Sequence, residues 1–175
     1  MRQFLTCGLL LIAAGTSVGD DKPEGKKTPE NANLAKMTKL VGTWVAADEN
    51  GKPTDQVVSV IKLTAGGSTV HETLFPGQDH EMVSIYTADG PDLVMTHYCM
   101  LGNQPRMKAD PKSPANQIRF NFDGGTNFDP KKDMHMHEGT LTFIDDDHIE
   151  FSGAAWVDGK PSPDHCATMK LVRKK

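Results

Sequence analysis

The amino-acid sequence predicts an all-β fold, an up-and-down antiparallel barrel of about ten strands with a short N-terminal helix. Beyond Gly42, runs of roughly five to ten residues alternate apolar and polar side chains, as half-buried strands do. Short breaks rich in turn residues, such as AGG, DGP and DDD, separate these runs and suit hairpins between antiparallel neighbours. No crossover helix interrupts the series. Full closure would protect the edges of so many strands, and a two-sheet sandwich is the alternative.

Residues 1–19 have the order of a secretory signal peptide. Arg2 precedes an apolar run from Phe4 to Ala14, and small residues follow up to Gly19. This order predicts an exported protein, periplasmic or secreted, that is cleaved near Gly19. The apolar run is too short to span a bilayer, so we expect no integral membrane segment in the mature protein.

Two further parts follow the leader. Residues 20–33, DDKPEGKKTPENAN, combine Pro, Gly and charges without apolar periodicity, which predicts a flexible tether. Residues 34–175 form the barrel domain. It begins with a short helix that has Leu34, Met37 and Leu40 at helical spacing, with Asn33 as its N-cap.

The strands of the barrel domain are each expected where a run of alternating residues lies between two breaks. The predicted strands are 42–48, 56–64, 68–75, 81–88, 92–101, 105–109, 117–123, 134–144, 148–157 and 165–173. The last break, DGKPSPD, spans residues 158–164.

The charge of the chain argues against a nucleic-acid partner. The formal net charge is −4, and removing the leader removes Arg2 and no acid, which gives −4 − 1 = −5. No basic stripe offsets this acidity, so we expect no binding to nucleic acid.

The stretch Leu40–Trp44, LVGTW, is similar to the Gly-x-Trp opening of lipocalin-like barrels. In that family the Trp packs at the closed end, often under an Arg from the final strand, and Arg173 matches this position. The segments THYC…GNQPRM and HMHEGTLTF…DDDHIEF also resemble small exported bacterial lipocalin-like proteins of unassigned activity. The resemblance covers most of residues 34–175. It implies a calycin-type barrel with an internal cavity, and it implies no reaction.

Alternation along the strands selects candidate cavity residues. In MHMHEGTLTF, His135 and His137 share parity with Leu141 and Phe143, which predicts that both imidazoles face inward unless a bulge near Gly139 flips the register.

Elsewhere the alternation is ambiguous. Parity scarcely decides the direction of His97 and Cys99 in DLVMTHYCML, or of His71 in STVHETLF. If the odd-numbered set faces inward, His97 and Cys99 enter the cavity. Tyr86 is either a cavity residue or core packing.

Arg106 follows the turn GNQP and also has two interpretations. It either lies at the cavity rim, where its guanidinium would bind a carboxylate or phosphate, or it pairs with an acid of the protein.

The paired histidines also suggest an alternative function, the binding of a metal ion. Residues at i and i+2 on a strand lie roughly 6–7 Å apart, so His135 and His137 would chelate one divalent transition metal with a third ligand such as His97. Haem held by one interior His is a narrower version of this hypothesis. Ordinary buried or rim histidines, hydrogen-bonded to neighbours, are the structural alternative.

After cleavage two cysteines remain, Cys99 and Cys166, and an exported protein tolerates a disulfide. Parity in HCATMKLVR places Cys166 on the outside, opposite to an inward Cys99, so a bridge would need a bulge. The disulfide state stays open at this point.

The leading hypothesis is an exported barrel that binds a small molecule in a partly polar cavity containing His71, His97, Cys99, Tyr86, His135 and His137, with Arg106 at the rim. One alternative is a metal- or haem-binding barrel, with weak enzymatic activity, that uses His135, His137 and a third ligand. A second alternative is a filled barrel that acts as a surface or assembly module. No nucleophile motif, phosphate-binding loop or paired carboxylates point to an enzyme.

Overall fold

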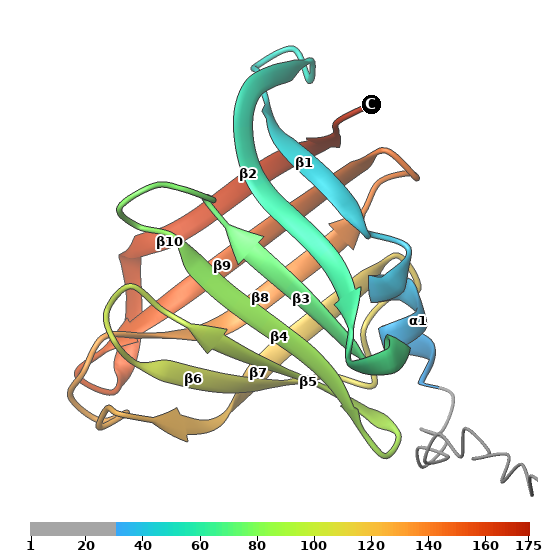
Figure 1. The fold of residues 1–175 in the computed structure, drawn as a ribbon. Coiled ribbons are helices and arrows are strands. Elements are labelled where there is room, and N and C mark those ends of the chain that lie inside the picture. The colour runs from blue at the N-terminus through green and yellow to red at the C-terminus, as the bar shows by residue number, and fades with distance from the viewer. Residues whose placement is uncertain (1–30) are drawn as a thin grey trace, which may run out of the picture.

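The computed structural model describes residues 31–175; the predicted leader and all of the predicted tether up to residue 30 lie outside the described residues. One short helix precedes ten strands, and a single 3₁₀ turn follows the second strand (Figure 1). The elements in chain order are α1 (Ala32–Thr38), β1 (Gly42–Ala47), β2 (Pro53–Thr64), η1 (Ala65–Gly67), β3 (Thr69–Leu74), β4 (Met82–Asp89), β5 (Asp92–Tyr98), β6 (Gln104–Ala109), β7 (Gln117–Thr126), β8 (His135–Phe143), β9 (His148–Val157) and β10 (Lys160–Arg173).

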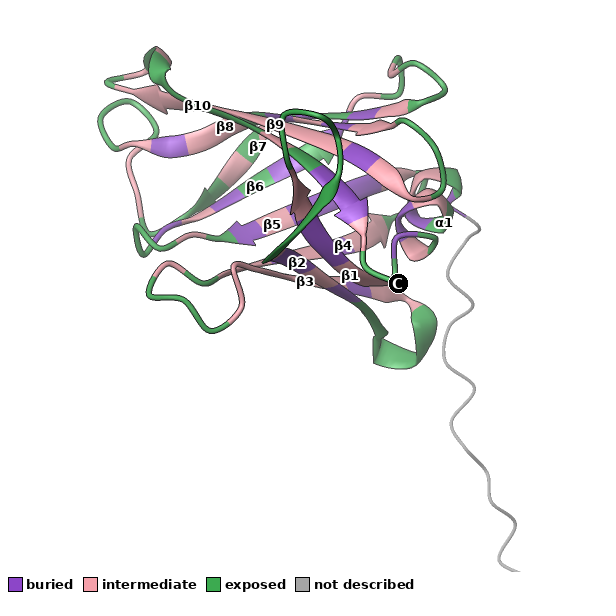
Figure 2. Ribbon diagram, turned by 90° about the horizontal axis from the view of Figure 1, so that it is seen from above, coloured by how far each residue is buried: buried purple, intermediate pink, exposed green. Residues whose placement is uncertain are grey.

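The strands form one closed antiparallel barrel in which each strand pairs with its neighbours in the chain and β1 pairs with β10. This confirms the predicted up-and-down barrel and excludes the sandwich. Closure leaves no strand of the described chain with an unpaired edge, which is how a sheet of this size avoids pairing with other chains. Buried and exposed positions alternate along the strands, and the hairpin turns are exposed (Figure 2).

Helix α1 lies at one end of the barrel (Figure 1). Its N-cap is Asn31, whose side chain accepts from the Leu34 N–H at 2.9 Å and donates to the Pro91 carbonyl of the β4–β5 turn at 3.0 Å. The expected cap, Asn33, instead belongs to the first turn of the helix, because Asn31 is the residue with the extended backbone that an N-cap needs. Leu34 and Met37 are buried and close this end of the barrel.

Trp44 of β1 packs beside α1 under the last residue of β10. The Trp44 indole N–H donates to the Leu40 carbonyl at 2.8 Å, and the Arg173 guanidinium carbon lies 4.4 Å from the centre of the indole ring. Arg173 also donates to the carbonyls of Val41 and Lys39, each at 2.9 Å. The predicted pairing of this Trp with this Arg is confirmed, and it fastens the ends of the first and last strands together.

The hairpin between β9 and β10 is tighter than predicted. The turn consists of Asp158 and Gly159, which both have positive φ, as a two-residue hairpin with the twist of the sheet requires. Residues 160–164, expected in the break, therefore continue β10 instead. Pairing shifts between Ser162 and Cys166, so the residues between them form a bulge that contains Pro163.

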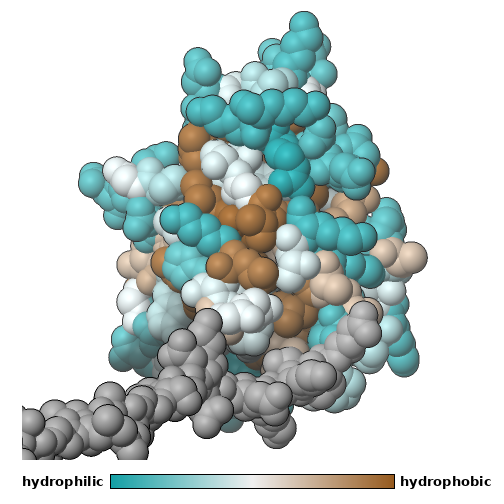
Figure 3. Space-filling view, turned by 45° about the vertical axis from the view of Figure 1, so that its right-hand side comes forward, coloured by the Kyte–Doolittle hydropathy of each residue, from teal (hydrophilic) through white to brown (hydrophobic). Residues whose placement is uncertain are grey.

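The outer surface is mostly hydrophilic around the hairpins. On the face seen in Figure 3, hydrophobic residues form a central band between hydrophilic projections. Among the described residues, the single helix is far too short to cross a bilayer.

Candidate functional site: the barrel pocket

A pocket of about 330 Å³ lies inside the barrel, between β3–β5 on one side and β8–β10 on the other. We call it the barrel pocket. Its inner end is formed by Met37 and Leu40, next to the closed end. Its outer end includes Met100 and Leu101 of the β5–β6 turn, which are 62% and 48% exposed. The pocket therefore opens to solvent beside this turn.

Small residues on β9 and β10 leave the space that the pocket occupies. Gly153, Ala155 and Ala167 line it where larger side chains would fill it. The Phe151 ring covers the paired glycines Gly139 and Gly153. A Cβ atom added to Gly139 would lie 3.3 Å from this ring, and one added to Gly153 would lie 3.4 Å from it. This wall is mainly apolar, and its polar residues are His135 and His165.

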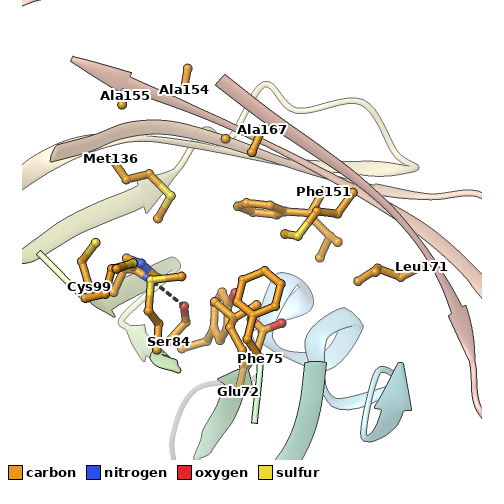
Figure 4. Close-up of a pocket in the computed structure, with 18 of the residues that line it drawn as sticks. Glu72, Phe75, Ser84, Cys99, Met136, Phe151, Ala154, Ala155, Ala167 and Leu171 are labelled. Carbon is orange, nitrogen blue, oxygen red and sulfur yellow. Dashed lines mark hydrogen bonds between the residues drawn. The ribbon is translucent and has the colours of Figure 1, made fainter. Parts of the chain in front are cut away.

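The opposite wall, on β3–β5, carries the polar groups (Figure 4). Glu72 points into the barrel, where its two carboxylate oxygens accept from the hydroxyls of Ser59 at 2.6 Å and Tyr86 at 2.7 Å. Burial raises the pKa of Glu72, and the two hydroxyl donors oppose that rise. Burial and the neighbouring Glu72 charge also raise the pKa of Tyr86 well above its ordinary value.

His97 lies on the same wall and is only 4% exposed. Its Nδ1 is hydrogen-bonded to the Ser84 hydroxyl at 3.0 Å, drawn as a dashed line in Figure 4. Burial lowers the pKa of His97 to about 4, so the imidazole is neutral at pH 7. Among the described residues no group bonds its Nε2, so that nitrogen is free to bond a molecule in the pocket.

Three of the candidates from the sequence reach the pocket wall on these strands. Tyr86, His97 and Cys99 all line it, which places the odd-numbered residues of β5 inside. His71 does not line it, because the register of β3 turns its neighbour Glu72 inward instead.

Arg106 also lies away from the pocket. It is on the outer face of β6, where its guanidinium is 3.4 Å from Asp89 and 3.4 Å from Asp123 and its side chain is 45% exposed. Of its two interpretations, the structure favours pairing with acids of the protein, and the rim position is wrong.

The predicted inward pair of His135 and His137 is not formed. Pairing between β8 and β9 shifts between Met136 and Glu138, so a bulge reverses the alternation at His137. Met136 consequently lines the pocket on the same wall as Leu141, whereas His137 does not line it. His135 is fully buried at the pocket edge.

The two imidazoles contact each other and a group of aromatic rings. His135 Nε2 is 2.9 Å from His137 Nδ1. The His137 ring stacks between Trp156, with centroids 3.7 Å apart, and Phe122, with centroids 4.6 Å apart. Burial, and then the nearby His135, lower the pKa of His137. These contacts show that His135 and His137 belong to an aromatic packing cluster at the rim of the barrel.

Within residues 31–175, no three side chains of His, Cys, Asp or Glu lie close enough together to hold a metal ion. The three-ligand arrangement of His135, His137 and His97 is therefore not present in the fold. Cys99 and Cys166 are both free thiols, the first half-buried in the pocket and the second exposed. Their positions on different faces of the barrel agree with the predicted parity.

Sequence reasoning missed Glu72, Ser84 and Met136. The signal for Glu72 was present, since it shares parity with Val70 and Leu74 and so interrupts an apolar face with a carboxylate. Ser84 shares parity with Met82 and Tyr86 in the same way. Met136 could not be found by parity alone, because a bulge turns it inward; Gly139, next to that bulge, was the one signal that the register could shift here.

Comparison of the chain with protein-family models and with curated proteins gives no match. A closed barrel of ten antiparallel strands, with a short helix before the first strand, fits a lipocalin-like or calycin-like fold.

Proposed function

We propose that this protein is an exported carrier or receptor that binds a small, mainly apolar molecule in the barrel pocket. The observation that carries the proposal is a pocket that combines one mainly apolar wall with one wall of hydrogen-bonding groups. Known ligand sites have this composition: apolar surface supplies most of the affinity, and a few polar groups fix the orientation. The resemblance to small bacterial lipocalin-like proteins, together with the leader-like residues 1–19, supports the exported location.

The size and chemistry of the lining fit such a ligand. A volume of about 330 Å³ is in the lower part of the range of small-molecule sites. Methionines contribute much of the apolar lining, and their unbranched, polarisable side chains adapt to ligands of different shape. They are Met37, Met82, Met100, Met134, Met136 and Met169.

Filling the pocket is expected to abolish binding. In Ala155→Phe the new ring would project beside Met136 into space that the ligand needs, so affinity for an uncharged naphthylamine fluorophore should fall by at least about tenfold. The increase in fluorescence on titration of residues 20–175 measures this affinity. The matched control is Thr168→Phe, which adds the same ring on the outer face of β10 and should bind as the wild type does.

Circular dichroism would establish that both variants keep the barrel. Equal binding by wild type and a folded Ala155→Phe variant would contradict the proposal, as would the absence of any binding to the wild type. The surface-module alternative predicts that second result.

A further inference from the structure

Glu72 is the acidic side chain of the barrel pocket. A pocket that binds only apolar molecules has no need of such a group. It stands on β3 between the inward-facing Val70 and Leu74, and it retains partial access to the pocket although protein surrounds it. An acid at an interior position costs free energy, because burial disfavours its charged form. Leucine at this position would pack without that cost.

The hydrogen bonds around Glu72 suit a carboxylate. Each oxygen accepts from one hydroxyl, Ser59 on one side and Tyr86 on the other. Both donors are themselves buried, so their positions are fixed by the fold. An ionised carboxylate accepts on both oxygens, and each oxygen keeps a further lone pair for a donor in the pocket.

Among the described residues, the Glu72 carboxyl group forms no ion pair. No Lys or Arg lines the pocket, and none of the ion pairs involves Glu72. His97 stays neutral at pH 7. His71 precedes Glu72 on the other face of β3, and it lowers the pKa of Glu72 less than the two hydroxyl donors do. His135 and His165 also line the pocket, and neither bonds Glu72. The pocket therefore holds a buried acid that forms no ion pair with any described side chain.

We propose that the natural ligand of the barrel pocket is an apolar amine, whose ammonium group pairs with the Glu72 carboxylate. The inference rests on the proposed function. A ligand ammonium would supply the missing positive charge and donate to the free lone pairs of Glu72. The apolar body of the ligand would extend toward Phe151 and Met136, which lie across the pocket from Glu72 and Ser84 (Figure 4). An anionic head group, such as the carboxylate of a fatty acid, would meet like charge and no cation.

Three ligands with the same chain and different head groups test this inference. Decylamine, decanol and decanoate would compete at pH 7 for the pocket of residues 20–175 loaded with the uncharged naphthylamine fluorophore. We expect decylamine to bind about tenfold more tightly than decanol, since close charge pairs in desolvated sites contribute at least this much. Decanoate should bind about tenfold more weakly than decanol, because Glu72 repels it.

The variant Glu72→Gln should bring the three affinities within about threefold of one another while the fluorophore still binds. The matched control, Glu49→Gln, removes one acid from the exposed β1–β2 turn and should keep the wild-type order. The order in the wild-type protein decides the question even if Glu72→Gln does not fold.

Equal affinity for amine and alcohol would overturn this inference, as would preference for the carboxylate or failure of all three to displace the fluorophore. None of those results would affect the proposed function, which depends on binding of the fluorophore and its loss in Ala155→Phe.

Discussion

Replacement of Trp44 by alanine should lower the free energy of unfolding by about 4 kcal/mol, because large aromatic residues removed from a packed interior leave a cavity that the surroundings fill only in part. The Trp44 side chain is fully buried among the core residues of the closed end. Its indole donates to the Leu40 carbonyl and supports the Arg173 guanidinium, so both contacts are lost with the ring. Urea unfolding followed by circular dichroism measures the change. A loss of this size is a large part of the stability of an ordinary domain.

The chain contains a second tryptophan that provides the matched control. Trp156 of β9 is half-buried and stacks on His137 at the rim. Trp156→Ala should cost about 1–2 kcal/mol, since it removes a stacked ring without opening a core cavity. If the two variants lost equal stability, the closed end would not be the principal anchor of the barrel.

The fold was predictable from sequence because its signals are local and repeated. Most strands alternate, the breaks contain turn residues, and no crossover helix separates the strands, so an antiparallel meander follows directly. The positions of Gly42, Trp44 and Arg173 in the sequence also predicted how the closed end of the barrel packs. The dipeptide Asp158-Gly159 is a signal for a tight hairpin turn. The prolines that follow it nevertheless led to the prediction of a longer break.

The pocket was only partly predictable, because parity gives a face only where a strand is regular and one face is clearly apolar. Both faces of β5 are largely apolar, and the closed barrel was needed to place His97 and Cys99 inside. In β8, one extra residue near His137 reverses the alternation. As a result, Met136 lines the pocket at the point where the His137 imidazole was expected. Pairing partners distant in sequence determine such a bulge, so a single strand does not reveal it.

The stability of the protein should fall by about 3 kcal/mol between pH 7 and pH 4 through His97 alone. Burial lowers the pKa of this histidine from 6.5 to about 4 in the folded protein, whereas the unfolded chain keeps the ordinary value. The unfolded state therefore binds a proton first as the pH falls, and the stabilisation present above pH 6.5 is lost progressively down to pH 4. A difference of about 2.5 pKa units corresponds to about 3 kcal/mol.

Other groups also have shifted pKa values, His137 and Glu72 among them, and they make a comparison with a variant necessary. The lowered pKa of His137 adds to the loss at low pH. The raised pKa of Glu72 acts in the opposite sense, because a folded carboxyl that holds its proton more tightly gains stability as the pH falls. Both contributions should cancel in the difference between wild type and His97→Asn, in which a neutral amide replaces the imidazole beside Ser84.

Urea unfolding of both proteins at pH 7 and pH 4 gives that difference. We expect the wild type to lose about 3 kcal/mol more than His97→Asn over this interval. Parallel loss in the two proteins would mean that His97 is as well solvated as in the unfolded chain. The β5 wall of the pocket would then be wet, and its imidazole would offer an incoming ligand no advantage over water.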